Sequence, residues 1–236
     1  LTTPTPLSLC DSDANPNNQY TNFNLTVKND QITGVVGSVG YTVTYYPSYA
    51  LALAGNIANA IADPTNYTNA SPAVQTLGVV VTTSQGCTSV TTLDIRVLPI
   101  PEPNTDPAPL APQCDYNLPG DMLETFDLTV NAAYIMNGDP SLTLEYYPTQ
   151  ADAIAQTNQI MTPSTALVGG NVWIRVENNR VDYLGNNCYV LVEQALTVNP
   201  LPVISTIADY QICEDDVLVN DGFEVFDLTS QAAALL

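Results

Sequence analysis

The chain has 236 residues, of which 45% are hydrophobic, so it can form one large or two small packed domains and is too apolar for general disorder. Its formal net charge is -20, and it contains no histidine. The charge repels nucleic acid and anionic lipid, and the lack of histidine excludes Ser-His-Asp triads, Cys-His dyads and histidine-containing zinc sites. We therefore expect no nucleic-acid partner and no enzyme.

No run of eighteen apolar residues occurs, so we expect no membrane insertion in this segment. The start, LTTPTPLSLC, lacks the basic and apolar regions of a secretion signal. The chain stops at FDLTSQAAALL, within a pattern that occurs earlier, and we interpret it as a piece of a longer protein.

The first copy of an internal repeat spans residues 1–98. It opens with Cys10 and an acidic residue, followed by the motif FNLT at residues 23–26 and a short helix that ends at Gly34. Alternating apolar and polar residues predict strands at 41–46 and 91–97, and an alanine-rich stretch at 50–62 predicts a helical crossover.

The second copy spans residues 99–199 and repeats these features in the same order. A proline-rich joint at residues 98–112 favours an extended, semi-rigid conformation. The motif FDLT follows at residues 126–129, with Thr129 as the expected helix N-cap. Strands are predicted at 142–147 and 171–177, with a helical crossover at 150–159 between them.

Residues 200–236 form the incomplete start of a third copy, in which FDLT recurs at residues 226–229. The first cysteines of the copies, Cys10, Cys114 and Cys213, precede the motif phenylalanine by 13, 12 and 13 residues. This regular spacing and about seven short strands per copy predict an all-β fold of tandem immunoglobulin-like β-sandwiches with short helical crossovers.

The cysteines predict one disulfide within each copy. If a copy has an odd number of strands, its first and last strands run in the same direction. With the first cysteine just before the first strand and the second in the turn before the last, both lie at the entry end. We therefore predict the pairs Cys10–Cys87 and Cys114–Cys188, and a partner for Cys213 beyond residue 236. The alternative is that these are buried thiols.

The combined pattern of Cys-acidic, FDLT, YYP, WIRVEN, Gly-x-x-Cys-Tyr and NPLP resembles tandem repeats of giant surface adhesins of gliding Bacteroidota, the SprB-like gliding-motility adhesins and related substrates of type IX secretion. The first copy departs from the pattern, since GVVVTTSQGC replaces the WIRVEN strand. The resemblance implies an extracellular filament, anchored to the outer membrane through parts outside this segment, that mediates surface attachment or gliding motility.

Two sets of side chains are candidates for ligand binding. The acidic openings of the copies could supply calcium with oxygen ligands: Asp115, Asp121, Asp215, Asp216 and Asp221. Solvated acidic loops and Asx turns are the alternative. Trp173 is either a core residue, which we favour, or a platform for a sugar ring. One tyrosine of each Tyr-Tyr-Pro motif should be exposed by strand alternation.

The leading functional interpretation is a structural and adhesive segment whose partners are adjacent repeats and a glycan or abiotic surface. The alternatives are a carbohydrate-binding module, in which each copy grips a glycan, and a self-associating filament subunit that donates or receives a strand.

Overall fold

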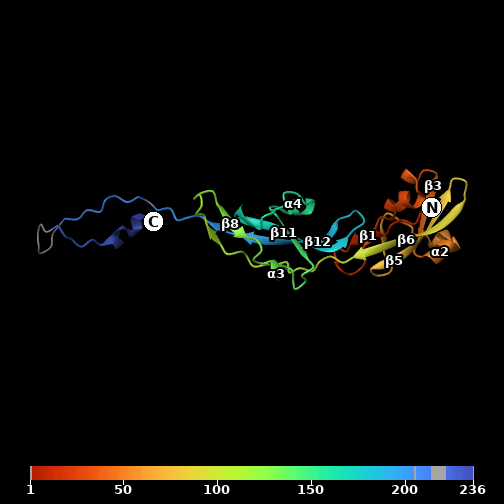
Figure 1. Ribbon diagram of the computed structural model, residues 1–236, viewed down its shortest axis with the longest axis horizontal. Helices are drawn as coiled ribbons and strands as arrows, with labels where there is room; N and C mark the ends of the chain where they lie inside the picture. The colour runs from red at the N-terminus through yellow and green to blue at the C-terminus, as the bar shows by residue number, and fades with distance from the viewer. Residues whose placement is uncertain (1, 205, 214–221, 236) are drawn as a thin grey trace.

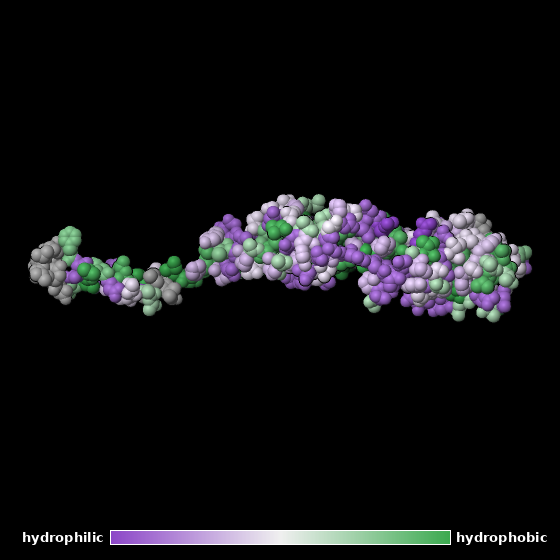
Figure 2. Space-filling view, turned by 90° about the horizontal axis from the view of Figure 1, so that it is seen from below, coloured by the Kyte–Doolittle hydropathy of each residue, from purple (hydrophilic) through white to green (hydrophobic). Residues whose placement is uncertain are grey.

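The computed structural model describes residues 2–204, 206–213 and 222–235. Two β-sandwiches lie end to end along the long axis, and the C-terminal residues extend beyond the second sandwich (Figure 1). Each sandwich has its own hydrophobic cluster, one drawn from residues 7–97 and the other from residues 110–198. On the face seen in Figure 2, hydrophilic and hydrophobic residues are intermixed over both sandwiches.

The first sandwich packs a four-stranded sheet against a two-stranded one. The large sheet has the order β1 (Leu7–Cys10), β6 (Thr88–Leu98), β5 (Val74–Thr83), β3 (Tyr41–Tyr46), and the small sheet pairs β2 (Asn22–Phe23) with β4 (Tyr67–Thr68). Strand β1 pairs with β6 in parallel, whereas the other neighbours are antiparallel. The helices are η1 (Leu25–Lys28), α1 (Asn29–Thr33), η2 (Val36–Ser38), α2 (Tyr49–Ala54) and η3 (Ile57–Asn59).

The second sandwich repeats this arrangement. Strands β12 (Asn187–Leu196), β11 (Gly170–Val181) and β9 (Thr143–Tyr147) correspond to β6, β5 and β3. The parallel pair of β7 (Gln113–Cys114) with β13 (Val198–Asn199) corresponds to β1 with the end of β6, and the pair of β8 (Leu123–Asp127) with β10 (Ser164–Val168) corresponds to β2 with β4. Helices α3 (Ala132–Ile135) and α4 (Gln150–Ala155) complete it. The predicted class of tandem all-β sandwiches with short helical crossovers is confirmed.

The FDLT motif at residues 126–129 and the FNLT motif at residues 23–26 build the same turn. Phe126 and Leu128 are buried in the core, as Phe23 and Leu25 are in the first sandwich. The Asp127 carboxylate accepts hydrogen bonds from the amide and the hydroxyl of Thr129, at 2.9 and 2.6 Å. These bonds hold the pKa of Asp127 below its ordinary value. The helix that follows, α3 (Ala132–Ile135), has Asn131 as its N-cap, so the prediction that Thr129 is the N-cap was wrong.

The short crossover helices cover the outer face of each large sheet. An added Cβ at Gly78 on β5 would lie 2.5 Å from the carbonyl oxygen of Ser48 and 2.9 Å from the Cα of Tyr49, so α2 touches the sheet directly. Tyr45 faces the core, whereas Tyr46 is buried on the opposite face, and both tyrosines of the second motif are buried too. The prediction of one exposed tyrosine per motif was wrong because strand alternation does not reveal that a helix covers the second face.

The C-terminal segment contains η4 (Leu228–Gln231) and α5 (Ala232–Leu235). Phe226 and Leu228, whose equivalents are buried in both sandwiches, are here 47% and 73% exposed. The third FDLT motif retains its turn nevertheless, since Asp227 accepts a hydrogen bond from the amide of Thr229 at 3.0 Å. The turn is thus encoded locally, and burial of its apolar residues requires the rest of a sandwich.

Candidate functional site: the junction of the two sandwiches

A disulfide joins the two sandwiches. Cys10, the last residue of β1, is bonded to Cys188, near the start of β12, with a Cα–Cα distance of 5.5 Å and a sequence separation of 178. Strand β1 ends at the exit from the first sandwich, and the β11–β12 hairpin of the second sandwich points back to this end (Figure 1). Cys188 is fully buried. The bond therefore lies at the junction and not within either unit.

This bond contradicts the predicted pairs Cys10–Cys87 and Cys114–Cys188. The first and last strands do run parallel, as expected, but Cys10 lies at the end of β1 and not before it, so it is beside Leu98 at the end of β6. Cys87 precedes the start of β6. Eleven residues at about 3.3 Å each place the two cysteines about 36 Å apart, far beyond the 4.4–6.8 Å that a disulfide allows. The same geometry separates Cys114 from Cys188.

The other cysteines, Cys87, Cys114 and Cys213, are exposed free thiols. Cys114 occupies in the second sandwich the place that Cys10 occupies in the first, because it ends β7 opposite Asn199 as Cys10 ends β1 opposite Leu98. A partner for Cys213 outside this segment remains a prediction.

The tip of the β11–β12 hairpin, residues 178–187, reaches across the junction. Asn178 donates a hydrogen bond from Nδ2 to the carbonyl of Pro99 at 2.9 Å, and the Tyr183 amide donates to the carbonyl of Ser8 at 2.9 Å. The Tyr183 ring packs against the core of the first sandwich and lies 5.6 Å from the ammonium nitrogen of Lys28. These contacts lie beside the disulfide and fix the approach of one sandwich to the other.

A buried polar cluster supports the base of this hairpin on the outer face of β11. The Arg175 guanidinium is 2% exposed, lies 3.4 Å from the centre of the Tyr189 ring and contacts Glu177 at 2.5 Å. Glu177 also accepts from Gln156 at 3.1 Å and from Asn187 at 2.6 Å. Because both charges are buried and satisfied, this cluster fixes the position of the strand that carries Cys188.

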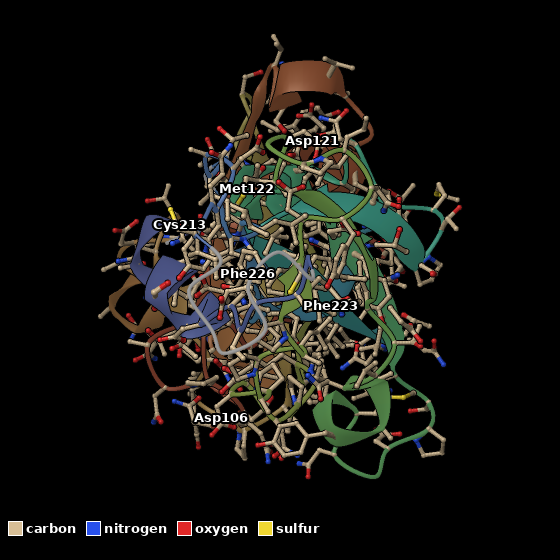
Figure 3. The ribbon with its side chains drawn as sticks, turned by 90° about the vertical axis from the view of Figure 1, so that its left-hand side faces the viewer. Asp106, Asp121, Met122, Cys213, Phe223 and Phe226 are labelled. Atoms are coloured by element: carbon tan, nitrogen blue, oxygen red, sulfur yellow. A yellow bond between two sulfur atoms is a disulfide. The ribbon has the colours of Figure 1, made fainter. Side chains whose placement is uncertain are left out.

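The proline-rich joint packs along the second sandwich. The Asn104 amide donates to the carbonyl of Ile135 at 3.1 Å, the Tyr134 hydroxyl donates to Asp106 at 2.7 Å, and Leu110 is buried in the second core. Figure 3, viewed along the long axis, shows Asp106 in the lower part of the view. The joint is extended, as its prolines predict, and it is held by contacts along its length.

Two grooves flank the junction. One, of about 820 Å³, is lined by Asp11 and Asn17 of the first sandwich and by Asp139 and Arg180 of the second. The other, of about 700 Å³, is lined by Cys10 and by residues that include Arg175 and Tyr189. Asp11 is buried, and its Oδ1 has no hydrogen-bond partner, as is also true of Asp115 at the equivalent position.

Of the residues predicted to bind calcium, the structure describes Asp115 and Asp121. Asp115 accepts a hydrogen bond from the Gly120 amide at 2.5 Å and Asp121 accepts one from the Leu123 amide at 2.8 Å, so both shape the loop before β8, where Figure 3 shows Asp121 beside Met122. In the part of the chain that the structure describes, no three acidic, cysteine or histidine residues are arranged to hold a metal ion. Asp215, Asp216 and Asp221 lie outside the described residues.

Trp173 does not belong to the core. Its neighbours Val172 and Ile174 fill the second hydrophobic cluster, whereas Trp173 is half-buried on the opposite face of β11, between Tyr147 and Glu193 on the adjacent strands. The favoured prediction of a core position was therefore wrong. Strand alternation correctly places Trp173 on the face of β11 opposite to Ile174. The apolar neighbours Val172 and Ile174 show that their face, and not that of Trp173, points into the core.

Two consecutive sandwiches linked by a disulfide across their junction define a tandem, extracellular type of β protein, because such bonds persist in oxidising environments. A family model described as the Flavobacterium inter-domain disulphide bond domain matches residues 6–101 and again residues 110–202. The chain belongs to this family. None of the curated proteins compared with the chain matches it.

Among solved structures, the chain is similar to SGBP-B of the Bacteroides ovatus mixed-linkage glucan utilization locus, in complex with a mixed-linkage heptasaccharide. The identity is 14% and the TM-score 0.22, over 82% of this chain and 43% of that one. It is also similar to human mucin-like protocadherin EC1-2, with 11% identity and a TM-score of 0.23, over 69% and 86% of the two chains. A third match, zebrafish RET cadherin-like domains 1 to 4, has 10% identity and a TM-score of 0.22, over 87% and 50%. TM-scores this low establish neither a common domain arrangement nor a common ligand.

A search of the described residues for a helix with the length and hydrophobicity of a membrane span finds none.

Proposed function

We propose that the chain is a structural segment of a large secreted bacterial surface protein, which spaces a binding region from the cell for surface attachment and gliding motility. The observation that carries the proposal is the Cys10–Cys188 bond, which joins two complete sandwiches and leaves both large sheets intact. A docked joint and a hairpin tip that crosses the junction add non-covalent contacts. Such an arrangement suits a rod that transmits force.

The same staple would continue along an array of repeats. The end of the second sandwich is built like the end of the first: the Asp11 amide donates to the carbonyl of Leu98 at 2.8 Å, and the Asp115 amide donates to that of Asn199 at 2.9 Å. Cys114 would then bond to the hairpin of a following sandwich. Because Cys114 lies between Cys10 and Cys188 in sequence, consecutive staples would overlap, and no sandwich would be free to separate from its neighbour.

The test uses cells that produce the parent protein, with Cys10→Ser and Cys188→Ser introduced together. We expect the parent to remain accessible to external protease, attachment in still medium to be unchanged, and attachment under flow to fall. A Cys87→Ser variant is the control, since Cys87 is not bonded within the two sandwiches. A parent found inside the cell, or attachment under flow equal to that of the unsubstituted protein, would refute the proposal.

The alternative of a carbohydrate-binding module is tested on the isolated chain with a glycan array. Half-exposed Trp173 is the only tryptophan, and the first sandwich has Gly78 in its place opposite the Tyr-Tyr-Pro motif. We expect no glycan to be retained. Binding that is lost in Trp173→Ala would replace the spacer by a glycan-binding function.

A further inference from the structure

The two hairpins that carry the second cysteine of each sandwich differ in length. In register with the Tyr-Tyr-Pro motifs, Tyr46 pairs with Gly78 and Tyr147 pairs with Trp173. Four residues further on, Thr82 pairs with Thr88 and Glu177 pairs with Tyr189. The tip before the cysteine therefore comprises residues 83–86 in the first sandwich and residues 178–187 in the second, a difference of 10 − 4 = 6 residues.

Among the described residues, hydrogen bonds and a ring contact join this longer tip to the first sandwich and to the start of the joint. Its side chains and amides reach Pro99 through Asn178, and Ser8 and Lys28 through Tyr183. Ser8 belongs to β1, an edge strand of the large sheet, so its carbonyl is available to a donor from outside the sheet.

The tip has a fixed shape of its own. The carboxylate of Asp182 accepts hydrogen bonds from the amides of Leu184 and Asn186 at 2.8 and 2.9 Å, and the Asp182 amide donates to the Asn186 carbonyl at 2.9 Å. Tyr183 is therefore presented on a closed turn, and little conformational freedom is lost when it docks.

The partner of the Tyr183 ring is distinctive in this chain. Lys28 is the only lysine, and its ammonium donates to the Thr5 hydroxyl at 3.0 Å. It also donates to the side-chain oxygen of Gln31 at 3.4 Å. Among the described residues no carboxylate pairs with it, and the face of the Tyr183 ring is the partner that the second sandwich supplies. At the equivalent position, five residues after the motif phenylalanine, the second sandwich has Asn131. The end of the second sandwich thus lacks the cation that Tyr183 meets at the end of the first.

We propose that residues 178–187 form a recognition arm, which docks Tyr183 on Lys28 and the edge of β1 and thereby selects Cys10 as the partner of Cys188. This inference rests on the proposed function, because it names what chooses the neighbour within the stapled rod. The thiols react after docking. With oxidised glutathione as oxidant, one protein thiolate forms a mixed disulfide and releases one glutathione. The second protein thiolate then attacks the protein sulfur of that disulfide and releases the other, so one glutathione disulfide is reduced to two thiols for each protein disulfide formed.

The test measures the effective concentration of Cys10 for Cys188 in the full chain, equilibrated with reduced and oxidised glutathione. Cys87, Cys114 and Cys213 are replaced by serine so that a single bond is followed. We expect Tyr183→Ala to lower the effective concentration about tenfold or more, and Lys28→Met to lower it about threefold, because docking sets the local concentration of the thiols. The effective concentration in Tyr183→Phe, which keeps the ring, should stay within about twofold of that in the chain with Tyr183 unchanged. Tyr116→Ala, at an exposed tyrosine of the second sandwich, is the matched control.

The five-cysteine chain tests selection directly. After refolding with oxidised glutathione, peptide mapping should find Cys188 bonded to Cys10 in the parent and shared among the other cysteines in Tyr183→Ala. Circular dichroism of each variant shows whether both sandwiches have folded, and an unfolded variant is replaced by Tyr183→Leu. Equal effective concentrations in the parent, Tyr183→Ala and Lys28→Met would overturn the arm, as would a loss in Tyr183→Phe as large as that in Tyr183→Ala. If flow resistance depends on the disulfide while these variants behave like the parent, only this inference fails; if the disulfide has no effect under flow, the proposed function fails whatever the variants do.

Discussion

When the two ends of the chain are pulled, the disulfide should prevent the residues between the two cysteines from extending. Cys10 and Cys188 are 178 positions apart in sequence, and a fully extended chain spans about 3.3–3.6 Å per residue, so this stretch corresponds to about 600 Å of contour length. In the folded state its ends are 5.5 Å apart. Force entering through β1 passes directly to β12 by the sulfur bridge. The residues between the two cysteines, with the cores of both sandwiches, are then bypassed.

Single-molecule force spectroscopy with handles at the two termini measures this length. The oxidised chain should show no release near 600 Å, and addition of a reductant should add about 600 Å in one or two steps. Cys188→Ser should give the long release without reductant, whereas Cys87→Ser should behave as the parent does. A long release from the oxidised parent would show that the bond does not carry the force, and the account of a stapled rod would be wrong.

Three further predictions concern side chains inside the two sandwiches and in the FDLT turn. Gly78→Ala should destabilise the first sandwich by about 1–3 kcal/mol in urea unfolding, because the added methyl meets the backbone of α2; an unchanged midpoint would contradict this contact. Arg175→Met should cost the second sandwich about 3–5 kcal/mol, since it leaves the buried Glu177 carboxylate unpaired, and adding Glu177→Leu should restore part of the loss. Thr129→Val should raise the pKa of Asp127 towards its ordinary value in an NMR titration, because the hydroxyl bond that lowers it is removed. A lowered carboxyl pKa stabilises the fold above the unfolded pKa, and this contribution is lost as the pH falls through the folded value, so the variant should lose less stability than the parent on acidification; the reverse order would refute the assignment.

Local patterns predicted the strands well where a hairpin or a motif marked them. The segment 41–46 is β3 to the residue, and 171–177 lies within β11. Sequence reasoning gave no range for several strands, and the one that matters most for the disulfides is β1. It is four residues long, follows a proline-rich start and pairs in parallel with a strand about ninety residues away, so neither a turn nor a long alternation signals it.

Missing β1 also led to the wrong disulfides. Placing Cys10 before a strand instead of at its end assigns it to the wrong end of the sandwich, the end where Cys87 lies. A bond within the copy is then the expected pairing. Regular spacing of cysteines in a repeat fits bonds within a copy and bonds to the next copy equally well. The difference between TSQGC in the first copy and the longer NNRVDYLGNNC in the second was the available signal, because an extra six residues at a hairpin tip suggest that the tip reaches something outside its own unit.

Mapping the cysteine linkages of the oxidised, unreduced chain addresses the central claim most directly. After proteolysis at acidic pH, which prevents exchange, mass spectrometry should find one peptide containing Cys10 joined to one containing Cys188, with the other three cysteines alkylated. Peptides that join Cys10 to Cys87, or Cys114 to Cys188, would show that each sandwich closes on itself and that no covalent staple crosses the junction.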